Sequence, residues 1–250
     1  MNNTNFLKNK NLSDNTLATY SSILNSLPEK IGKKSVDNFC NRIKGSNATK
    51  RLKLVILKTY LNFLGKNDIA KSIILPKKEN KKINIPEKDI EKAIEDSKDN
   101  HLDHAIIMTL IGTGLRVSEL CNLKLSDFLK DQTQTTITGK GKKIRLVFFS
   151  DNSIKAINEY LKVRDHASDY LFTTRTGRMY QKFVDRILKS YSPRLHPHIL
   201  RHYFATKLLN NGANIMSVKD ILGHSSVLTT QIYLNLSNNQ LKDQHRLINI

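Results

Sequence analysis

Several residues in the second half of the chain have side chains that can bind a phosphate or move a proton. His198 and Arg201 are three residues apart, so a helix would place them on one face. Arg201 also lies near the expected start of that helix, where backbone N–H groups favour an anion. Arg116 follows a Gly-Thr-Gly turn, where the chain can approach a ligand closely. Lys140 stands between two glycines at the expected tip of a hairpin.

Two further residues extend this pattern. His224 comes directly after Leu222-Gly223, which reads as the end of a helix, and Tyr233 follows nine residues later in another short helical segment. Each residue alone also has an ordinary structural interpretation. A histidine at a helix start often stabilises the fold, a tyrosine in an amphipathic helix often packs in the core, and a glycine–lysine turn is often only exposed. The combination, rather than any single residue, favours a functional site.

Metal ions offer an alternative route to phosphate chemistry, and two-metal sites need clustered carboxylates. Glu119 is the one acidic residue inside these motifs. His196, His198 and His202 form an H-x-H-x₃-H string that could suggest zinc. Pro197 separates the first two, however, and no Cys or Glu ligand stands nearby. We therefore expect neither a metal nor another cofactor.

The charge of the chain points to a polyanionic partner. Lys and Arg number 41 against 22 Asp and Glu, which gives a formal net charge of +19. Residues 1–80 carry 15 basic and 5 acidic side chains, so this part is the more basic per residue. Such an excess attracts nucleic acid or an anionic membrane surface. The base composition of the source genome is an alternative origin for a chain rich in Lys and Asn.

Composition excludes other classes. Apolar residues make up 39% and charged residues 25% of the chain, as in ordinary globular proteins and unlike disordered or membrane-embedded ones. We find no apolar run of the roughly 20 residues that span a bilayer, and no secretory signal. The two cysteines, Cys40 and Cys121, are far apart, which suits a reducing compartment. We expect a cytoplasmic protein with no membrane association.

The pattern of apolar residues predicts helices in the first third of the chain, at 16–27, 35–44 and 49–64. In the last of these, apolar residues form the expected core face, namely Leu52, Val55, Ile56, Leu57, Tyr60, Phe63 and Leu64. Basic residues lie mostly off that face, namely Lys50, Arg51, Lys53 and Lys58. This basic flank is either simply solvated, in contact with phosphates, or laid on a membrane.

The remainder of the chain predicts a second domain. A segment with a proline, clustered charge and no periodicity separates the two, so we place domains at 1–78 and 85–250 with a linker at 79–84. β-Branched runs at 133–138 and 143–149 predict a hairpin around Gly139-Lys-Gly-Lys. Helices are predicted at 86–96, 101–112, 153–166, 182–191, 198–210, 216–222, 227–236 and 238–248, with a short one ending near Asn122. The fold class is mostly α with a small antiparallel β-sheet (α+β).

The motifs together resemble one known family. They are Gly112-Thr-Gly-Leu-Arg-Val-Ser-Glu-Leu, Gly139-Lys-Gly-Lys, Pro197-His-Ile-Leu-Arg-His, Leu222-Gly-His-Ser and Tyr233. Their order and spacing over residues 84–250 resemble the tyrosine recombinases, the phage-integrase and Xer family of site-specific DNA recombinases. Residues 1–80 resemble, less closely, the helical core-binding domain of that family. The resemblance implies that residues 85–250 form the catalytic domain.

The resemblance also implies roles for individual residues. Tyr233 would be the nucleophile that forms a 3′-phosphotyrosine. Arg116 and Arg201 would bind the scissile phosphate, and Lys140 would protonate the leaving 5′-oxygen. His198 would act as an acid and base. These are the residue types that the reaction needs, because guanidinium groups bind two phosphate oxygens and stay charged, and a poor leaving group needs a proton donor.

Supporting roles follow from the same resemblance. His224 would hydrogen-bond the phosphate, Glu119 would orient its neighbours, and His202 would support the site. Lys50, Arg51, Lys53 and Lys142 are the expected DNA contacts.

The implied activity is strand exchange on double-stranded DNA at a specific site, through a Holliday junction, by an Xer-like enzyme or a mobile-element integrase. The implied assembly is a homo-tetramer on DNA, with a paralogous recombinase or an accessory protein as a possible further partner. Three alternatives stay open. A type IB topoisomerase would share the chemistry without a partner site, a sequence-specific DNA-binding protein would lack the chemistry, and a basic membrane-surface protein would need neither.

Overall fold

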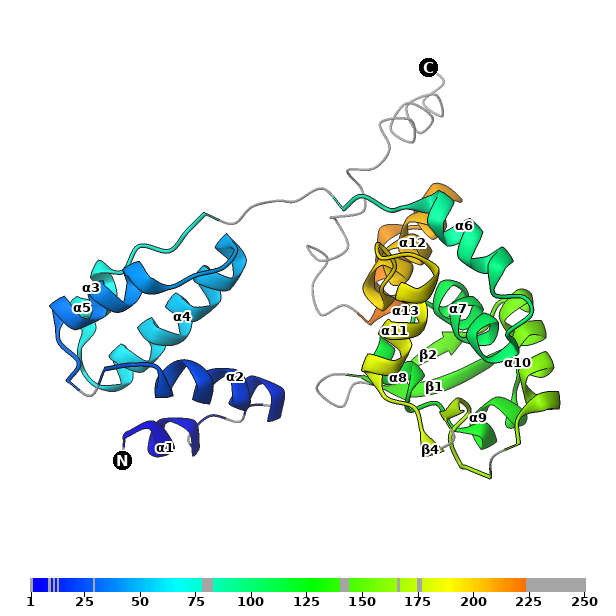
Figure 1. Ribbon diagram of the computed structural model, residues 1–250, viewed down its shortest axis with the longest axis horizontal. Coiled ribbons are helices and arrows are strands. Elements are labelled where there is room, and N and C mark those ends of the chain that lie inside the picture. The colour runs from blue at the N-terminus through cyan, green and yellow to red at the C-terminus, as the bar shows by residue number, and fades with distance from the viewer. Residues whose placement is uncertain are drawn as a thin grey trace, which may run out of the picture. The chain divides into compact units, whose positions relative to one another are not determined.

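The structure is a computed structural model that describes residues 2–8, 10, 12, 14–28, 30–77, 83–139, 144–165, 167–174 and 177–223. The chain divides into two compact units, Met1–Lys81 and Lys82–Ile250, which we call the N-terminal and C-terminal units (Figure 1). Each unit has its own buried apolar core, so each is described by itself.

The N-terminal unit is helical. It contains α1 (Asn2–Lys8), α2 (Asp14–Asn25), α3 (Lys33–Arg42), α4 (Asn47–Phe63) and α5 (Asn67–Ser72). The longest of these, α4, begins at Ser46, whose side chain accepts a hydrogen bond from Thr49 N. It ends before Gly65, which has a left-handed φ of +73°. Helices α2 and α5 both contact α4, so α4 is the organising element of this unit.

The buried face of α4 agrees with the predicted one only in part, since Ile56, Leu57 and Tyr60 are buried as expected. Leu54, Leu57 and Leu61 are buried, and their i, i+3, i+7 spacing defines the face toward α2 and α5. Leu52 and Val55 are instead 50% and 38% exposed. A residue two positions before Leu54 is rotated by about 200° around the helix, so it points away from the core. The prediction was wrong at these two positions and at Phe63, which is 44% exposed, because the apolar stripe of α4 is wider than the surface that its neighbours cover.

The C-terminal unit is built around one buried helix, α7 (His101–Thr113), which lies in the middle of the unit in Figure 1. Helices α10 (Asp151–Val163) and α12 (Pro197–Asn210) make its main contacts. Apolar residues such as Ile106, Ile107 and Leu110 are fully buried on different sides of α7, as expected for a helix enclosed by others. The remaining helices are α6 (Glu87–Asp96), α8 (Val117–Leu120), α9 (Leu125–Lys130), α11 (Gln181–Tyr191) and α13 (Ile215–Leu222).

The predicted hairpin is present as two antiparallel strands, β1 (Gln134–Thr138) and β2 (Ile144–Phe148). Their register pairs Ile137 with Arg145 and Thr135 with Val147. Val147 is buried, whereas Ile144 and Phe148 are exposed, so the alternation of β2 sets an inner and an outer face. A second, short pair joins β3 (Thr173–Thr174) to β4 (Gly177–Arg178), which the sequence did not predict.

The fold class predicted from sequence is confirmed, since the structure is largely helical with a small antiparallel sheet. Three short helices, α1, α5 and α9, were not predicted. The helices predicted at 227–236 and 238–248 lie outside the described residues. No helix in the described part of the chain is long and apolar enough to cross a membrane.

Candidate active site

Arg116 is positioned by a tight turn between α7 and α8. Helix α7 ends at Gly114, whose φ of +62° is in the left-handed region. A Cβ atom on Gly114 would lie 2.3 Å from Cδ1 of Phe204 in α12, so the turn needs glycine for space as well as for conformation. Arg116 is then the residue that begins α8, with its side chain 29% exposed.

Glu119 holds Arg116 in this position. Arg116 donates from its backbone N to Glu119 Oε2 at 2.7 Å and from Nη1 to Glu119 Oε1 at 2.9 Å. This pairing closes the first turn of α8 like a capping box, in which the third residue of a helix binds back to its start. Glu119 is only 8% exposed, so its charge needs partners. Its position agrees with the predicted orienting role, which stays a prediction.

A further arginine, Arg145 in β2, also binds the Glu119 carboxylate. Arg145 Nη1 and Nη2 donate to Glu119 Oε1 and Oε2 at 2.9 and 2.7 Å. Burial alone would raise the pKa of Glu119, but the hydrogen bonds and charges of Arg145 and Arg116 outweigh it and lower the pKa to about 2. Glu119 is therefore a carboxylate at every physiological pH. The sequence analysis missed Arg145, although it shares the inner face of β2 with the buried Val147.

Arg201 is positioned by the start of α12. Pro197 is at the first position of the helix, and His196 Nδ1 accepts a hydrogen bond from Ile199 N at 3.2 Å. This fixed start places Arg201 in the interior, where it is 4% exposed. Its guanidinium donates from Nη1 to Gly114 O and from Nη2 to Leu222 O. Arg201 thus joins the turn after α7 to the end of α13.

The end of α13 brings the three arginines together. Its last carbonyl groups accept hydrogen bonds in succession: Ile221 O from Arg145 Nε at 3.0 Å, Leu222 O from Arg201, and Gly223 O from Arg116 Nη2 at 3.1 Å. Carbonyls at a helix C-terminus lack intrahelical partners and carry partial negative charge, so cations are favoured there. Gly223 ends the helix with a left-handed φ of +64°.

Two histidines of α12 lie near these arginines. Partial burial, followed by the charges of His196, Arg201 and Arg116, lowers the pKa of His198. Burial and then the charges of His198, His196 and Arg201 lower the pKa of His202 to about 4. Both rings are therefore mainly neutral at pH 7, and a neutral imidazole has one nitrogen that donates a hydrogen bond and one that accepts.

The structure brings together Arg116, Glu119, His198, Arg201 and His202 out of the predicted site residues. Four others, Lys140, Lys142, His224 and Tyr233, lie outside the described residues. The chain enters the segment that holds His224 and Tyr233 directly after Gly223, at the arginine cluster.

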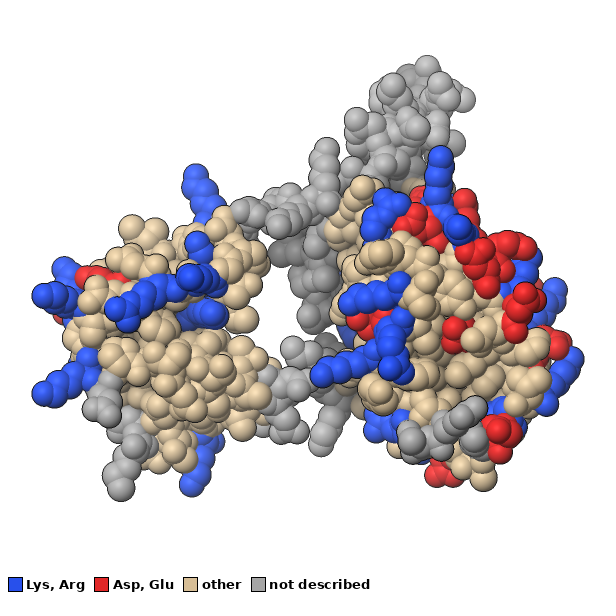
Figure 2. Space-filling view, in the orientation of Figure 1, with Lys and Arg blue, Asp and Glu red and all other residues tan. Residues whose placement is uncertain are grey.

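The three predicted DNA contacts of the N-terminal unit are half-buried residues of α4. Arg51 Nη1 donates to Pro76 O at 2.7 Å, so this side chain also joins α4 to the segment after α5. Figure 2 shows basic side chains and few acidic ones on the visible face of this unit, whereas acidic side chains gather over α6 in the C-terminal unit.

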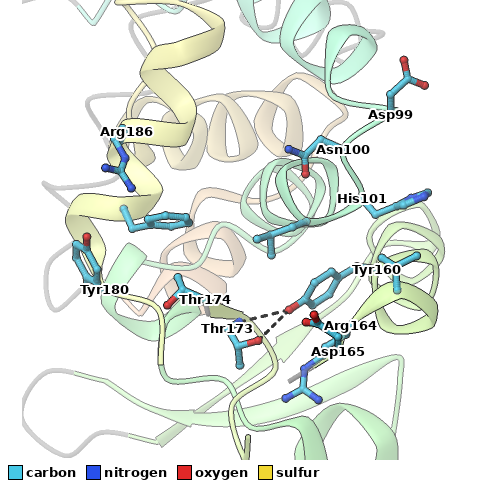
Figure 3. A pocket seen from close by; sticks show the side chains of 13 residues that line it. Asp99, Asn100, His101, Tyr160, Arg164, Asp165, Thr173, Thr174, Tyr180 and Arg186 are labelled. Atoms are coloured by element: carbon cyan, nitrogen blue, oxygen red, sulfur yellow. Dashed lines mark hydrogen bonds between the residues drawn. The ribbon is translucent and has the colours of Figure 1, made fainter. Parts of the chain in front are cut away.

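A cavity of about 700 Å³ lies elsewhere in the C-terminal unit, at the start of α7 (Figure 3). Its lining includes His101, Tyr160, Thr173 and Arg186, and none of the predicted site residues. In the part of the chain that the structure describes, no three His, Cys, Asp or Glu residues are grouped as metal ligands would be.

Comparison with known proteins identifies the family. Residues 71–240 match the model of the phage integrase family, which is more than half of the chain. Tyrosine recombinase XerC of Leptospira interrogans is 32% identical over 279 aligned positions, which cover 97% of this chain and 90% of the relative. Tyrosine recombinase XerA of Pyrococcus furiosus is 38% identical over 198 residues, or 75% of this chain and 69% of the relative. The chain belongs to the phage integrase family and is a tyrosine recombinase.

Solved structures agree with this membership. The crystal structure of XerA recombinase is 25% identical and superposes with a TM-score of 0.57, covering 98% of this chain and 96% of that one. The Tn1549 transposon integrase in complex with circular intermediate DNA is 20% identical with a TM-score of 0.70, covering 98% and 97%. This second likeness shows the fold alone. Family membership supports site-specific recombination as the activity.

Proposed function

We propose that this protein is a site-specific DNA recombinase of the Xer-like or mobile-element integrase type, which cuts and rejoins strands through a 3′-phosphotyrosine at Tyr233. One observation carries the proposal: three guanidinium groups and a neutral histidine meet where the chain enters the segment with His224 and Tyr233. Such a cluster suits a scissile phosphodiester, because the guanidinium groups of Arg116 and Arg201 can bind phosphate oxygens and stay charged.

Arg116 and Arg201 bind the phosphate in this proposal. A guanidinium has five N–H donors. The contacts of Arg116 with described residues, Glu119 Oε1 and Gly223 O, use two of the five. Arg116 is also partly exposed, so it can reach a substrate. The phosphorane-like transition state carries more negative charge than the phosphodiester, and a preorganised donor of this kind contributes on the order of 10²–10³ in rate.

Proton transfers complete the reaction. Tyr233 Oη attacks the phosphorus and gives its proton to the neutral ring of His198. The bond between phosphorus and the 5′-oxygen breaks, and that oxygen takes a proton from Lys140 Nζ. His224 hydrogen-bonds the phosphate, while Glu119 and His202 support the arginine and histidine positions. The new ester keeps the energy of the phosphodiester, so a 5′-hydroxyl of another strand can reverse the step without ATP.

The N-terminal unit contributes DNA binding. Its excess of basic side chains, with Lys50, Arg51 and Lys53 on α4, supports contact with the phosphate backbone, and Lys142 adds a further contact. The solved structure of XerH recombinase bound to difH substrate has the same fold, with a TM-score of 0.67 at 24% identity, covering 92% of this chain and 76% of that one. We further propose that a homo-tetramer on two sites exchanges strands through a Holliday junction.

Covalent trapping tests this function. Genomic DNA of the source organism, fragmented and partly nicked, is incubated with the protein in excess EDTA. Adducts that resist SDS and disappear with protease are recovered and sequenced. Wild type should form adducts at a small set of sites, and Tyr233→Phe should form none. Tyr180→Phe is the matched control, because Tyr180 is an exposed tyrosine of the same unit outside the motifs and should leave adduct formation unchanged.

Each other outcome refutes a part of the proposal. Adducts that persist in Tyr233→Phe would exclude Tyr233 as the nucleophile. Adducts that require a divalent metal would exclude the metal-independent reaction. Adducts spread over the genome, together with relaxation of supercoiled DNA, would favour a type IB topoisomerase. Binding without adducts in either protein, even with nicked DNA, would favour a DNA-binding protein without catalysis.

A further inference from the structure

Arg145 has no role in the reaction as proposed above, yet it is among the most completely bonded side chains of the site. It is 11% exposed and donates to both oxygens of Glu119 and to Ile221 O. A Cβ atom on Gly223 would lie 2.9 Å from Cδ of Arg145, so the end of α13 is also in close contact with this side chain. Arg145 therefore connects β2, α8 and α13.

We propose that Arg145 is a positioning residue for recombination, which controls how Arg116 is presented to the phosphate. This inference rests on the proposed role of Arg116. Arg145 itself would not touch the DNA, and it acts in two ways, through Glu119 and through α13.

The first way is competition for the carboxylate. Each Glu119 oxygen accepts one hydrogen bond from Arg145 and one from Arg116, the latter from the backbone N at Oε2 and from Nη1 at Oε1. Because Arg145 occupies both oxygens, the Arg116 guanidinium is bound to Glu119 through one nitrogen only. Without Arg145, a two-pronged Arg116–Glu119 pair would form, since guanidinium and carboxylate favour that geometry. Such a pair would turn Arg116 away from Gly223 O and from the substrate.

The second way is the position of the chain at residue 223. Arg145 Nε holds Ile221 O at 3.0 Å, two residues before the carbonyl that Arg116 holds. Arg145 thus fixes the position of the last carbonyl groups of α13, and Arg116 and Arg201 donate hydrogen bonds to the carbonyl groups that follow Ile221. An error of about 1 Å in the position of a catalytic group can lower a rate by about 10²-fold.

The test compares Arg145→Lys, Arg145→Met and Glu119→Gln in the whole 250-residue chain. Lysine keeps the charge but lacks the two-pronged donor. Single-turnover adduct formation is measured at saturating DNA, on a site recovered by covalent trapping. We expect Arg145→Lys to lower the rate by about 10- to 100-fold, with DNA affinity within about threefold. In the Glu119→Gln background, Arg145→Lys should lower the rate by a smaller factor than in wild type, because the part of its effect that passes through Glu119 is already lost while the part that passes through α13 remains.

Arg164→Lys is the matched control. Arg164 is a half-buried arginine of the same unit, held by the carbonyls of Ser168 and Tyr170 at 2.7 and 3.0 Å, and has no contact with Glu119 or α13 among the described residues. Its substitution should leave the rate unchanged. Far-UV circular dichroism and the unfolding midpoint verify that each variant is folded. If Arg145→Met does not fold, the rate of Arg145→Lys alone tests the positioning role.

A measurement without DNA separates this inference from the proposed function. In protein with ¹⁵N-labelled arginine, the side-chain N–H resonance of Arg116, assigned with Arg116→Lys, should move in Arg145→Lys and stay in place in Arg164→Lys. An unmoved resonance overturns the positioning role whatever the activity of the protein. A wild-type rate in Arg145→Lys, or additive effects with Glu119→Gln, also overturns it. Absence of adducts in wild type with a moved resonance refutes the proposed function and leaves the contact with Arg116 established.

Discussion

The ionisation of Glu119 should make a measurable contribution to stability that disappears in acid. The carboxyl group is buried, and the two arginines lower its pKa from an ordinary 4.5 to about 2. Because the folded state binds this proton less readily than the unfolded state does, the contribution is fully present above about pH 4.5. It is lost as the pH falls toward 2.

The size of the effect follows from the same values. At about 1.4 kcal/mol for each tenfold change in proton affinity, a pKa lowered from 4.5 to about 2 corresponds to about 3 kcal/mol near neutral pH. About half of this remains at pH 3. The perturbation is Glu119→Gln, which keeps the shape and removes the charge. The assay is urea unfolding followed by far-UV circular dichroism at several pH values, with wild type and Glu119→Gln measured in parallel.

We expect wild type to be more stable than Glu119→Gln by about 3 kcal/mol at pH 7, and this difference to fall to about half as the pH is lowered to 3. Asp127→Asn is a suitable control, since Asp127 lies in the first turn of α9 and Glu119, not Asp127, is the carboxylate that Arg116 and Arg145 bind among the described residues. A difference between wild type and Glu119→Gln that stays constant from pH 7 to pH 3 would refute the electrostatic explanation. The carboxylate would then act by shape and hydrogen bonding alone.

Three further predictions concern other parts of the site. Arg201→Ala should leave DNA affinity within a few-fold but lower adduct formation by at least about 10²–10³; an equal loss of binding and cleavage would contradict its assignment to the phosphate. Gly114→Ala should destabilise the protein by about 1–3 kcal/mol in urea unfolding, and by more than Gly212→Ala, because both glycines have positive φ but only Gly114 would clash with a neighbour. His202 should make the protein less stable as the pH falls from 6.5 toward 4. Its pKa in the folded state is about 4, against an ordinary 6.5, so over this range the unfolded state binds a proton that the folded state does not. The unfolding midpoint of His202→Gln should therefore fall less steeply than that of wild type between pH 7 and 4.5.

The sequence predicts the elements of this fold well where the apolar period is long. The buried helix α7 is found at His101–Thr113 against a predicted 101–112, and the hairpin strands agree to within about a residue. Short elements were missed, because a helix such as α9 has six residues and shows less than two turns of any period. The predicted face of α4 was too wide for a different reason: burial depends on which neighbouring helices pack against it, and a single sequence does not contain that information.

The site was predictable to the extent that its chemistry lies in local motifs. Arg116 with Glu119, and His198 with Arg201, each stand three residues apart on one turn of helix. Arg145 could not be found in this way, because its partners Glu119 and Ile221 are 26 and 76 residues away in sequence. The available signal was a charged residue on the same strand face as a buried valine, which requires a compensating partner. That rule predicts that a partner exists without saying which residue it is.

The charge balance of the site explains why it can bind a phosphodiester and still fold. Three guanidinium groups meet one carboxylate, Glu119, and the end of α13, which carries about half a negative charge. The cluster therefore keeps a net charge of roughly +1.5 before any substrate arrives. Burial is the main cause of the lowered pKa of His198, and the positive charges of His196, Arg201 and Arg116 lower it further, in agreement with this excess. A second carboxylate would stabilise the folded protein but would remove the charge that attracts the phosphate. A single, shared carboxylate is thus the arrangement that satisfies both requirements.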